Sequence, residues 1–173
     1  DPTLDDDAMA ATHALRERFT GALLGLAAGD ALAAATQFRK PGSFTPVGDL
    51  LGGGPFELPR GAWSDDTAMA LCVADSLLER GEFDPVDQIE RFIRWQREGY
   101  LSATGQCVGI TGGVTRALGT AGWRRQRFPG SHDPAQLAPE VLTRVAPVVL
   151  HYFNEPGAAI ERAAEPSAAS GRS

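Results

Sequence analysis

Three adjacent residues, Ser64, Asp65 and Asp66, carry the side-chain oxygens best placed for chemistry in this sequence. They follow a Gly/Pro-rich stretch and open an apolar-periodic run, so Ser64 is positioned to cap a helix. The two carboxylates then fall in the first helical turn, where the helix dipole favours negative charge. A hydroxyl and two carboxylates are also the hard ligands that Mg²⁺, Mn²⁺ or Ca²⁺ prefer. The three residues by themselves leave two interpretations open, a capped helix and a metal site.

Two further features have a bearing on chemistry. The segment Gly105–Gly113 is small and Gly-rich, and glycines let backbone amides approach a phosphate or a ribose closely. Asp30 stands near the end of an apolar segment, where a helix dipole disfavours a carboxylate. We expect Asp30 to tie down amides of a neighbouring loop, with a role in a site as the alternative.

The elements that must position these residues are helical. Apolar residues recur at three- and four-residue steps, no alternating strand pattern is present, and the chain is predicted to be all-α. The expected helices are about 8–35, 64–80 with Gly81 as its C-cap, 84–99 beginning at Asp84-Pro85, 114–118, 134–153 bounded or kinked by Pro139 and Pro147, and 158–164. A long loop over 39–63 and a basic loop over 119–133 separate them.

The first helix contains Gly21, Gly25 and Gly29 at four-residue spacing. Each costs roughly 1 kcal/mol relative to Ala in a helix interior, so their presence on one face suggests close approach of another backbone. We therefore expect this helix to be buried and tightly packed.

Length and composition narrow the class of protein. The 173 residues predict a single domain, 1–173, with flexible ends over 1–10 and 166–173. A net charge of −6 argues against nucleic acid as the main partner, and we expect no membrane-spanning segment because no apolar run approaches about 20 residues. The N-terminus is acidic, unlike a signal peptide, and two cysteines make neither a disulfide framework nor a zinc site, so a cytoplasmic location is expected.

Two stretches, taken together, resemble the ADP-ribosylglycohydrolase family, which includes the dinitrogenase-reductase-activating glycohydrolase and the ADP-ribosylarginine hydrolases. The first runs from Phe19 through Gly29-Asp30-Ala31 to Leu32, and the second is Gly61-Ala62-Trp63-Ser64-Asp65-Asp66-Thr67-Ala68-Met69. Gly105-Gln106-Cys107 and Arg144-Val145-Ala146-Pro147-Val148 resemble two shorter family segments. The resemblance covers about Arg18 to Glu165.

The resemblance implies an all-α fold with two divalent metal ions, Mg²⁺ or Mn²⁺, and hydrolysis of the N- or O-glycosidic bond between ADP-ribose and a protein or small acceptor. By position, Ser64, Asp65 and Asp66 would be metal ligands, and Asp65 and Asp66 would also be catalytic. Gly109, Thr111, Gly112 and Gly113 would line the ADP-ribose.

The sequence departs from the family pattern in three ways. Gln37 stands where the family usually has a Glu that acts as an acid/base or metal-linked residue, and an amide cannot take up a proton. Val108-Gly109-Ile110-Thr111-Gly112 replaces Phe-Asp-Ile-Gly-Asn, and Ala138–Thr143 stands where the family has Asn-Gly-Ser before its Met-Arg segment. Family members are longer and have a second Asp-x-Asp-Thr cluster, so we expect this chain to correspond to the N-terminal part of the fold. The alternatives to an enzyme are a module that binds ADP-ribose without cleaving it, an inactive relative, and a helical domain in which Ser64–Asp66 is only a cap.

Overall fold

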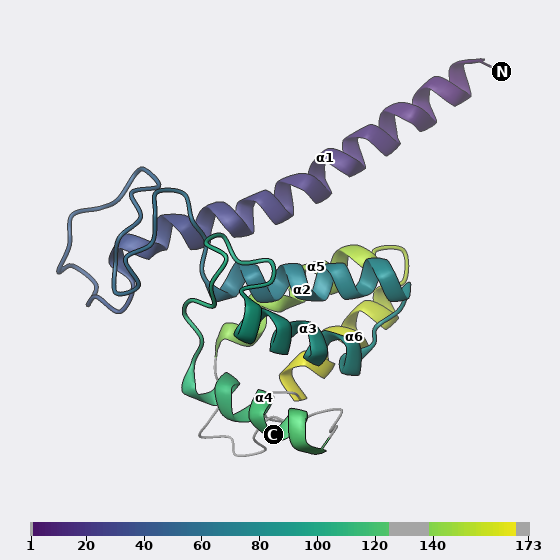
Figure 1. The fold of residues 1–173 in the computed structure, drawn as a ribbon. Coiled ribbons are helices and arrows are strands. Elements are labelled where there is room, and N and C mark those ends of the chain that lie inside the picture. The colour runs from purple at the N-terminus through teal and green to yellow at the C-terminus, as the bar shows by residue number, and fades with distance from the viewer. Residues whose placement is uncertain (1, 125–138, 169–173) are drawn as a thin grey trace.

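The computed structural model describes residues 2–124 and 139–168, and within these ranges the molecule is helical, as predicted. The elements, in chain order, are α1 (Pro2–Ala33), the 3₁₀ helix η1 (Ala34–Thr36), α2 (Asp65–Arg80), α3 (Pro85–Glu98), α4 (Gly112–Arg124), the 3₁₀ helix η3 (Pro139–Arg144), α5 (Val145–His151) and α6 (Pro156–Ala168). Helices α2, α3, α5 and α6 form a bundle, and α1 runs past it with its N-terminal end extending away (Figure 1).

Local sequence signals set the ends of α2 and α3 where we predicted them. Gly81 adopts a left-handed conformation, and its N–H donates to the Leu77 carbonyl to end α2. The Asp84 side chain accepts hydrogen bonds from the amides of Val86 and Asp87, and Pro85 is the first residue of α3.

The core lies between α2 and α3, with contributions from α4 and α5. It consists of buried apolar side chains around Trp95 and Cys72, completed by Ala68, Met69, Val73, Leu77, Phe83, Ile89, Phe92, Leu118 and Val148. Because these residues come from helices distant in the sequence, their burial fixes the orientation of α2 and therefore of its N-terminus.

A polar network on Arg91 also joins α2 to α3. The guanidinium is only 6% exposed and pairs with Asp87 and Glu79 at 2.7 Å each, and with Asp75. Asp75 also accepts from the Tyr100 hydroxyl. Three carboxylates around one buried cation satisfy its donors, which is the condition under which a charge is tolerated below the surface.

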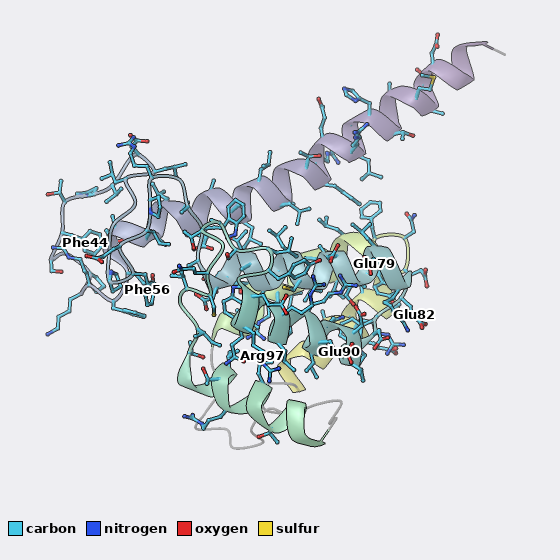
Figure 2. All side chains as sticks on the ribbon, in the orientation of Figure 1. Phe44, Phe56, Glu79, Glu82, Glu90 and Arg97 are labelled. Atoms are coloured by element: carbon cyan, nitrogen blue, oxygen red, sulfur yellow. The ribbon has the colours of Figure 1, made fainter. Side chains whose placement is uncertain are left out.

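The loop between η1 and α2 is long, as predicted, and only partly packed. Leu58 is buried against Ala34 and Ala62, and an isolated bridge joins Gly53 to Leu58. Phe44 and Phe56 lie in this loop beyond the C-terminal end of α1 (Figure 2). The loop thus stays attached to the end of α1, which keeps residues 62–64 close to Asp30.

The expectation of a buried first helix is wrong. A side chain built at Gly21, Gly25 or Gly29 would meet nothing within 4 Å, and Leu24 is 64% exposed. Only one side of α1 contacts α2 and α5, so the small-residue face has no partner among the described residues. Glycines at four-residue spacing permit another helix to pack closely, but they do not ensure that such a helix is present.

Helix α1 also departs from the expectation that no segment could span a membrane. By length and composition alone, Asp6–Thr36 is apolar enough to do so. The same helix contacts α2 and α5, and its last turn takes part in the hydrogen-bonded cluster described below, as in a helix of a folded domain.

Two boundaries differ further along the chain. α4 continues through Gly119 to Arg124, beyond the predicted 114–118, so the first part of the expected basic loop is helical. The predicted helix over 134–153 is divided into η3 and α5, with Pro139 opening η3 and Pro147 in the first turn of α5. Residues 125–138, with Arg125 and Arg127, lie outside the described part, as does the tail beyond 168.

Candidate functional site

The carboxylate of Asp30 joins the last turn of α1 to the first turn of α2. Its Oδ1 accepts a hydrogen bond from the Ser64 hydroxyl at 2.6 Å. Its Oδ2 accepts from the amides of Ser64 and Thr67 at 3.0 Å each, and from the Thr67 hydroxyl at 2.7 Å. The expectation that Asp30 ties down amides of a neighbouring segment is confirmed.

This cluster changes how α2 is capped. Ser64 occupies the N-cap position with extended backbone, as predicted, but its side chain makes no capping hydrogen bond. Asp30, 34 residues earlier, accepts from the Thr67 amide that a capping side chain would otherwise take. The negative charge at Asp30 also complements the positive end of the α2 dipole.

Asp65 follows immediately and is only 6% exposed. Burial, and after it the neighbouring charge of Asp66, raise the pKa of the Asp65 carboxyl to about 7, against hydrogen bonding that lowers it. Asp66 is more exposed than Asp65 and occupies the next position of the same turn. The helix start therefore presents two adjacent carboxyl groups, one of them buried and titrating near neutrality.

The Gly-rich segment passes directly over Asp65. A Cβ built at Gly109 would lie 2.2 Å from Asp65 Oδ1 and 2.9 Å from its Cγ. Thr111 precedes α4 and its Oγ1 accepts a hydrogen bond from the Val114 amide at 3.2 Å, while Gly112 and Gly113 lie in the first turn of the helix. Two segments that the sequence singled out separately thus meet in space.

Cys107 lies in the same Gly-rich segment, two residues before Gly109. Its thiol is half-buried, and burial together with the charge of Asp65 raises its pKa to about 11. A thiol that stays protonated at neutral pH is a poor nucleophile, so Cys107 has a packing role beside Asp65.

The structure also places Gln37 and the Arg144–Val148 segment, which the family resemblance singled out. Gln37 follows η1 directly and is half-buried. Arg144 is buried beside Phe92, with its guanidinium 5.8 Å from the ring centroid, and Val148 is fully buried. The Arg144–Val148 segment therefore contributes to the core and packs against α2.

The sequence placed Thr67 in the family motif but gave it no role. Its hydroxyl and amide both donate to Asp30, and the signal for it was the spacing of three residues from Ser64 at a helix start. What the sequence could not supply was the acceptor, which lies on another helix.

The donor set can be tested against a divalent cation. Ser64 Oγ donates its proton to Asp30 and keeps its lone pairs, and Asp65 and Asp66 add carboxylate oxygens, all of which are hard donors. A cation between two adjacent carboxylates would also remove the repulsion that raises the Asp65 pKa. Within residues 2–124 and 139–168, however, no group of three or more His, Cys, Asp or Glu residues is arranged so that it could hold a metal ion. The described residues fit one side of a hard-metal site.

Comparison with known proteins agrees with this picture. Residues 11–171 match the family model described as ADP-ribosylglycohydrolase. The chain is 40% identical to ADP-ribosylarginine hydrolase Tri1 of Pseudomonas putida (strain GB-1) over 136 residues, which are 78% of this chain and 36% of that protein. It is 34% identical over 97 residues to a glycohydrolase of ADP-ribosyl-dinitrogen reductase from Rhodospirillum rubrum, covering 54% of this chain and 33% of that one.

A solved structure shares the fold. A chain of an "ADP-ribosylglycohydrolase-related protein complex" superimposes with a TM-score of 0.78 at 39% sequence identity, covering 92% of this chain and 50% of that chain. The chain thus spans about a third of the two curated relatives and half of the solved one.

Proposed function

The chain belongs to the ADP-ribosylglycohydrolase family, and from this premise we propose that it contributes to a metal-dependent hydrolase. The proposed reaction is cleavage of the N- or O-glycosidic bond of ADP-ribosylated proteins or small acceptors, with release of ADP-ribose. The hydrolases named above act on ADP-ribosylarginine and on ADP-ribosylated dinitrogen reductase. An arginine-linked substrate is therefore the first one to test.

One observation carries the proposal. The Asp30 cluster fixes the start of α2 so that Ser64, Asp65 and Asp66 stand together, with the Gly109 backbone against Asp65. A structural cap needs neither a buried carboxyl group beside it nor a glycine crossing above that group. Burying a titratable group near neutral pH costs stability, and such groups are concentrated at functional sites.

In this proposal each residue has a defined task. Ser64, Asp65 and Asp66 would hold one or two Mg²⁺ or Mn²⁺ ions. Such ions, when bound, supply positive charge to substrate oxygens and increase the acidity of coordinated water. The N-terminus of α4, at Thr111, Gly112 and Gly113, offers the positive end of a helix dipole to a diphosphate. Because Asp65 is protonated in part at neutral pH, metal binding would release a proton from its carboxyl group.

A second function is favoured by one residue. Gln37 stands where the family has a glutamate, and an amide cannot act as a general acid or base. A module that binds ADP-ribose without cleaving it would need the Gly109–Gly113 segment but no proton transfer at position 37.

Calorimetric titration with Mn²⁺ tests the metal site. We expect the wild type to bind Mn²⁺, Asp66→Ala to lose binding, and Asp49→Ala to bind as the wild type does, because Asp49 is an exposed loop residue paired with Arg60. Helix content should change little in Asp66→Ala. Absence of wild-type binding at millimolar Mn²⁺ would leave the cap interpretation standing.

Activity is tested by release of ADP-ribose from ADP-ribosylarginine in the presence of Mn²⁺. Metal-dependent release would support the hydrolase. A flat time course together with saturable ADP-ribose binding would exclude the hydrolase for this chain and support the binding module.

A further inference from the structure

The backbone at Gly109 lies closer to Asp65 than any side chain would allow. A Cβ at this position would be 2.2 Å from Oδ1, 2.9 Å from Cγ and 3.4 Å from Cβ of Asp65. Real Cβ atoms do not approach other heavy atoms below 3.0 Å, and Gly109 also has a φ of +84°, which disfavours other residues. Only glycine fits this crossing.

Asp65 is therefore held from two directions. From the helix side, Asp30 fixes the backbone of Ser64 and Thr67 on either side of it. From the loop side, the Gly109 backbone lies against its carboxylate, and Asp65 is 6% exposed. Asp66 is more exposed.

We propose that Gly109 is a positioning residue of the site: its bare backbone fixes the orientation of the Asp65 carboxylate that is to meet the metal. This role differs from the substrate contact that the family resemblance implies for Gly109, and it rests on the proposed metal function. Residues that orient metal ligands without touching the metal typically affect affinity 10- to 100-fold.

Gly105 provides a matched control. It lies in the same loop with a φ of +75°, so alanine there suffers a similar backbone strain, but a Cβ at Gly105 would meet nothing within 4 Å. The difference in stability or in Mn²⁺ affinity between Gly109→Ala and Gly105→Ala therefore reports the contact with Asp65.

A double-mutant cycle tests the crossing without metal. In urea unfolding of the full chain, Gly109→Ala should lower the midpoint further than Gly105→Ala. In an Asp65→Ala background this excess should disappear, because the truncation removes Oδ1 and Cγ and leaves only the Cβ at 3.4 Å. Equal effects of the two glycine substitutions in the wild-type background, or an excess that persists in Asp65→Ala, would overturn the proposed contact.

Mn²⁺ titration tests the positioning role, which a purely structural glycine would not affect. We expect Gly109→Ala to bind Mn²⁺ about ten-fold or more weakly, and Gly105→Ala to bind as the wild type does. Unchanged affinity in a folded Gly109→Ala would overturn the proposal. If the wild type itself fails to bind Mn²⁺, the proposed function and the positioning role both fail, while the stability cycle still decides whether Gly109 fixes Asp65.

Discussion

Asp65 combines two properties that conflict in a simple helix cap. It lies in the first helical turn, where negative charge is stabilised, yet its burial and the adjacent Asp66 favour the protonated form. Desolvation has the larger effect, so the pKa of this carboxyl is raised to about 7. The folded chain therefore carries a carboxyl group whose ionisation costs stability unless a cation is present.

The sign of the pH dependence follows directly. Between pH 4 and 7 the folded state holds a proton on Asp65 that the unfolded state, with an ordinary pKa of 3.8, has lost. Stability from this group is present at low pH and is lost as the pH rises through about 7. Asp65→Asn should therefore be more stable than the wild type at pH 8, by roughly 1–3 kcal/mol, with the difference vanishing near pH 4.

Metal-free urea unfolding at pH 4, 6 and 8 measures this difference. Asp49→Asn is the control, because its partner Arg60 lowers the pKa of Asp49 and removing that charge gives no gain at high pH. A difference between Asp65→Asn and wild type that does not vary with pH would contradict the raised pKa.

At the scale of elements, the site is a junction between helix ends. The last turn of α1 supplies Asp30, the first turn of α2 supplies its donors, and the loop before α4 closes over Asp65. Packing around Trp95 and the Arg91 network orient α2 against α3, and the Asp30 cluster orients α2 against α1. No single helix end forms the site, because the acceptor, the donors and the covering backbone come from three separate segments.

Asp30→Ala should weaken this junction. It removes a capping carboxylate with four hydrogen bonds, two of them to the amides of Ser64 and Thr67, and we expect a loss of about 2–3 kcal/mol of stability. Asp30→Asn keeps one amide oxygen as an acceptor and should lose less.

Urea unfolding of the wild type and both variants gives the order of stability. The Asp49→Ala variant, which removes an exposed ion pair, should be indistinguishable from the wild type. Wild-type stability in Asp30→Ala would show that the cluster does not hold the two helices together.

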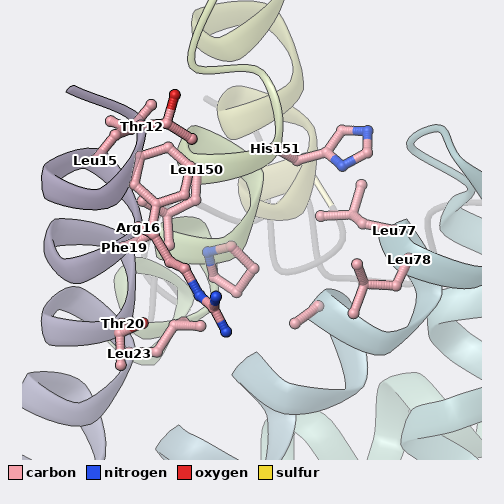
Figure 3. A pocket seen from close by; sticks show the side chains of 12 residues that line it. Thr12, Leu15, Arg16, Phe19, Thr20, Leu23, Leu77, Leu78, Leu150 and His151 are labelled. Atoms are coloured by element: carbon pink, nitrogen blue, oxygen red, sulfur yellow. The ribbon is translucent and has the colours of Figure 1, made fainter. Parts of the chain in front are cut away.

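At the scale of the whole molecule, α1 is attached to the other described helices along only one side. Leu15, Phe19 and Leu23 of α1 face Leu77 and Leu78 of α2 across an apolar cavity of about 520 Å³ (Figure 3). Leu150 and His151 of α5 also line this cavity. Phe19 and Phe153 make an edge-to-face contact with ring centroids 5.4 Å apart. These side chains attach α1 on one side, and the glycine face on the other remains open.

Amide hydrogen exchange should reflect this unequal support. We expect amides of residues 8–14 in α1 to exchange much faster than those of residues 69–77 in α2, because an isolated helix is marginally stable and the α2 residues are in the core. Mass spectrometry of the exchanged full chain measures both segments at once, with α3 expected to match α2. Equal protection of α1 and α2 would show that α1 is covered in solution.

The sequence by itself determined the helical class, the ends of α2 and α3, and the place of Ser64, Asp65 and Asp66 at a helix start. These features depend on periodicity and on capping residues within a few positions of one another, such as Gly81 and Asp84-Pro85. It also identified Asp30 as a residue in need of a partner, because a carboxylate in the last turn of a helix opposes the dipole.

Only the tertiary structure decided which partner that would be. The hydrogen bonds of Asp30 span 34 and 37 residues, and the crossing of Gly109 over Asp65 spans a still longer stretch of chain. The open face of α1 was likewise decided by packing, since glycine spacing is the same whether or not a second backbone is present. Contacts of this kind depend on the path of the chain between the segments, which neither periodicity nor local capping encodes.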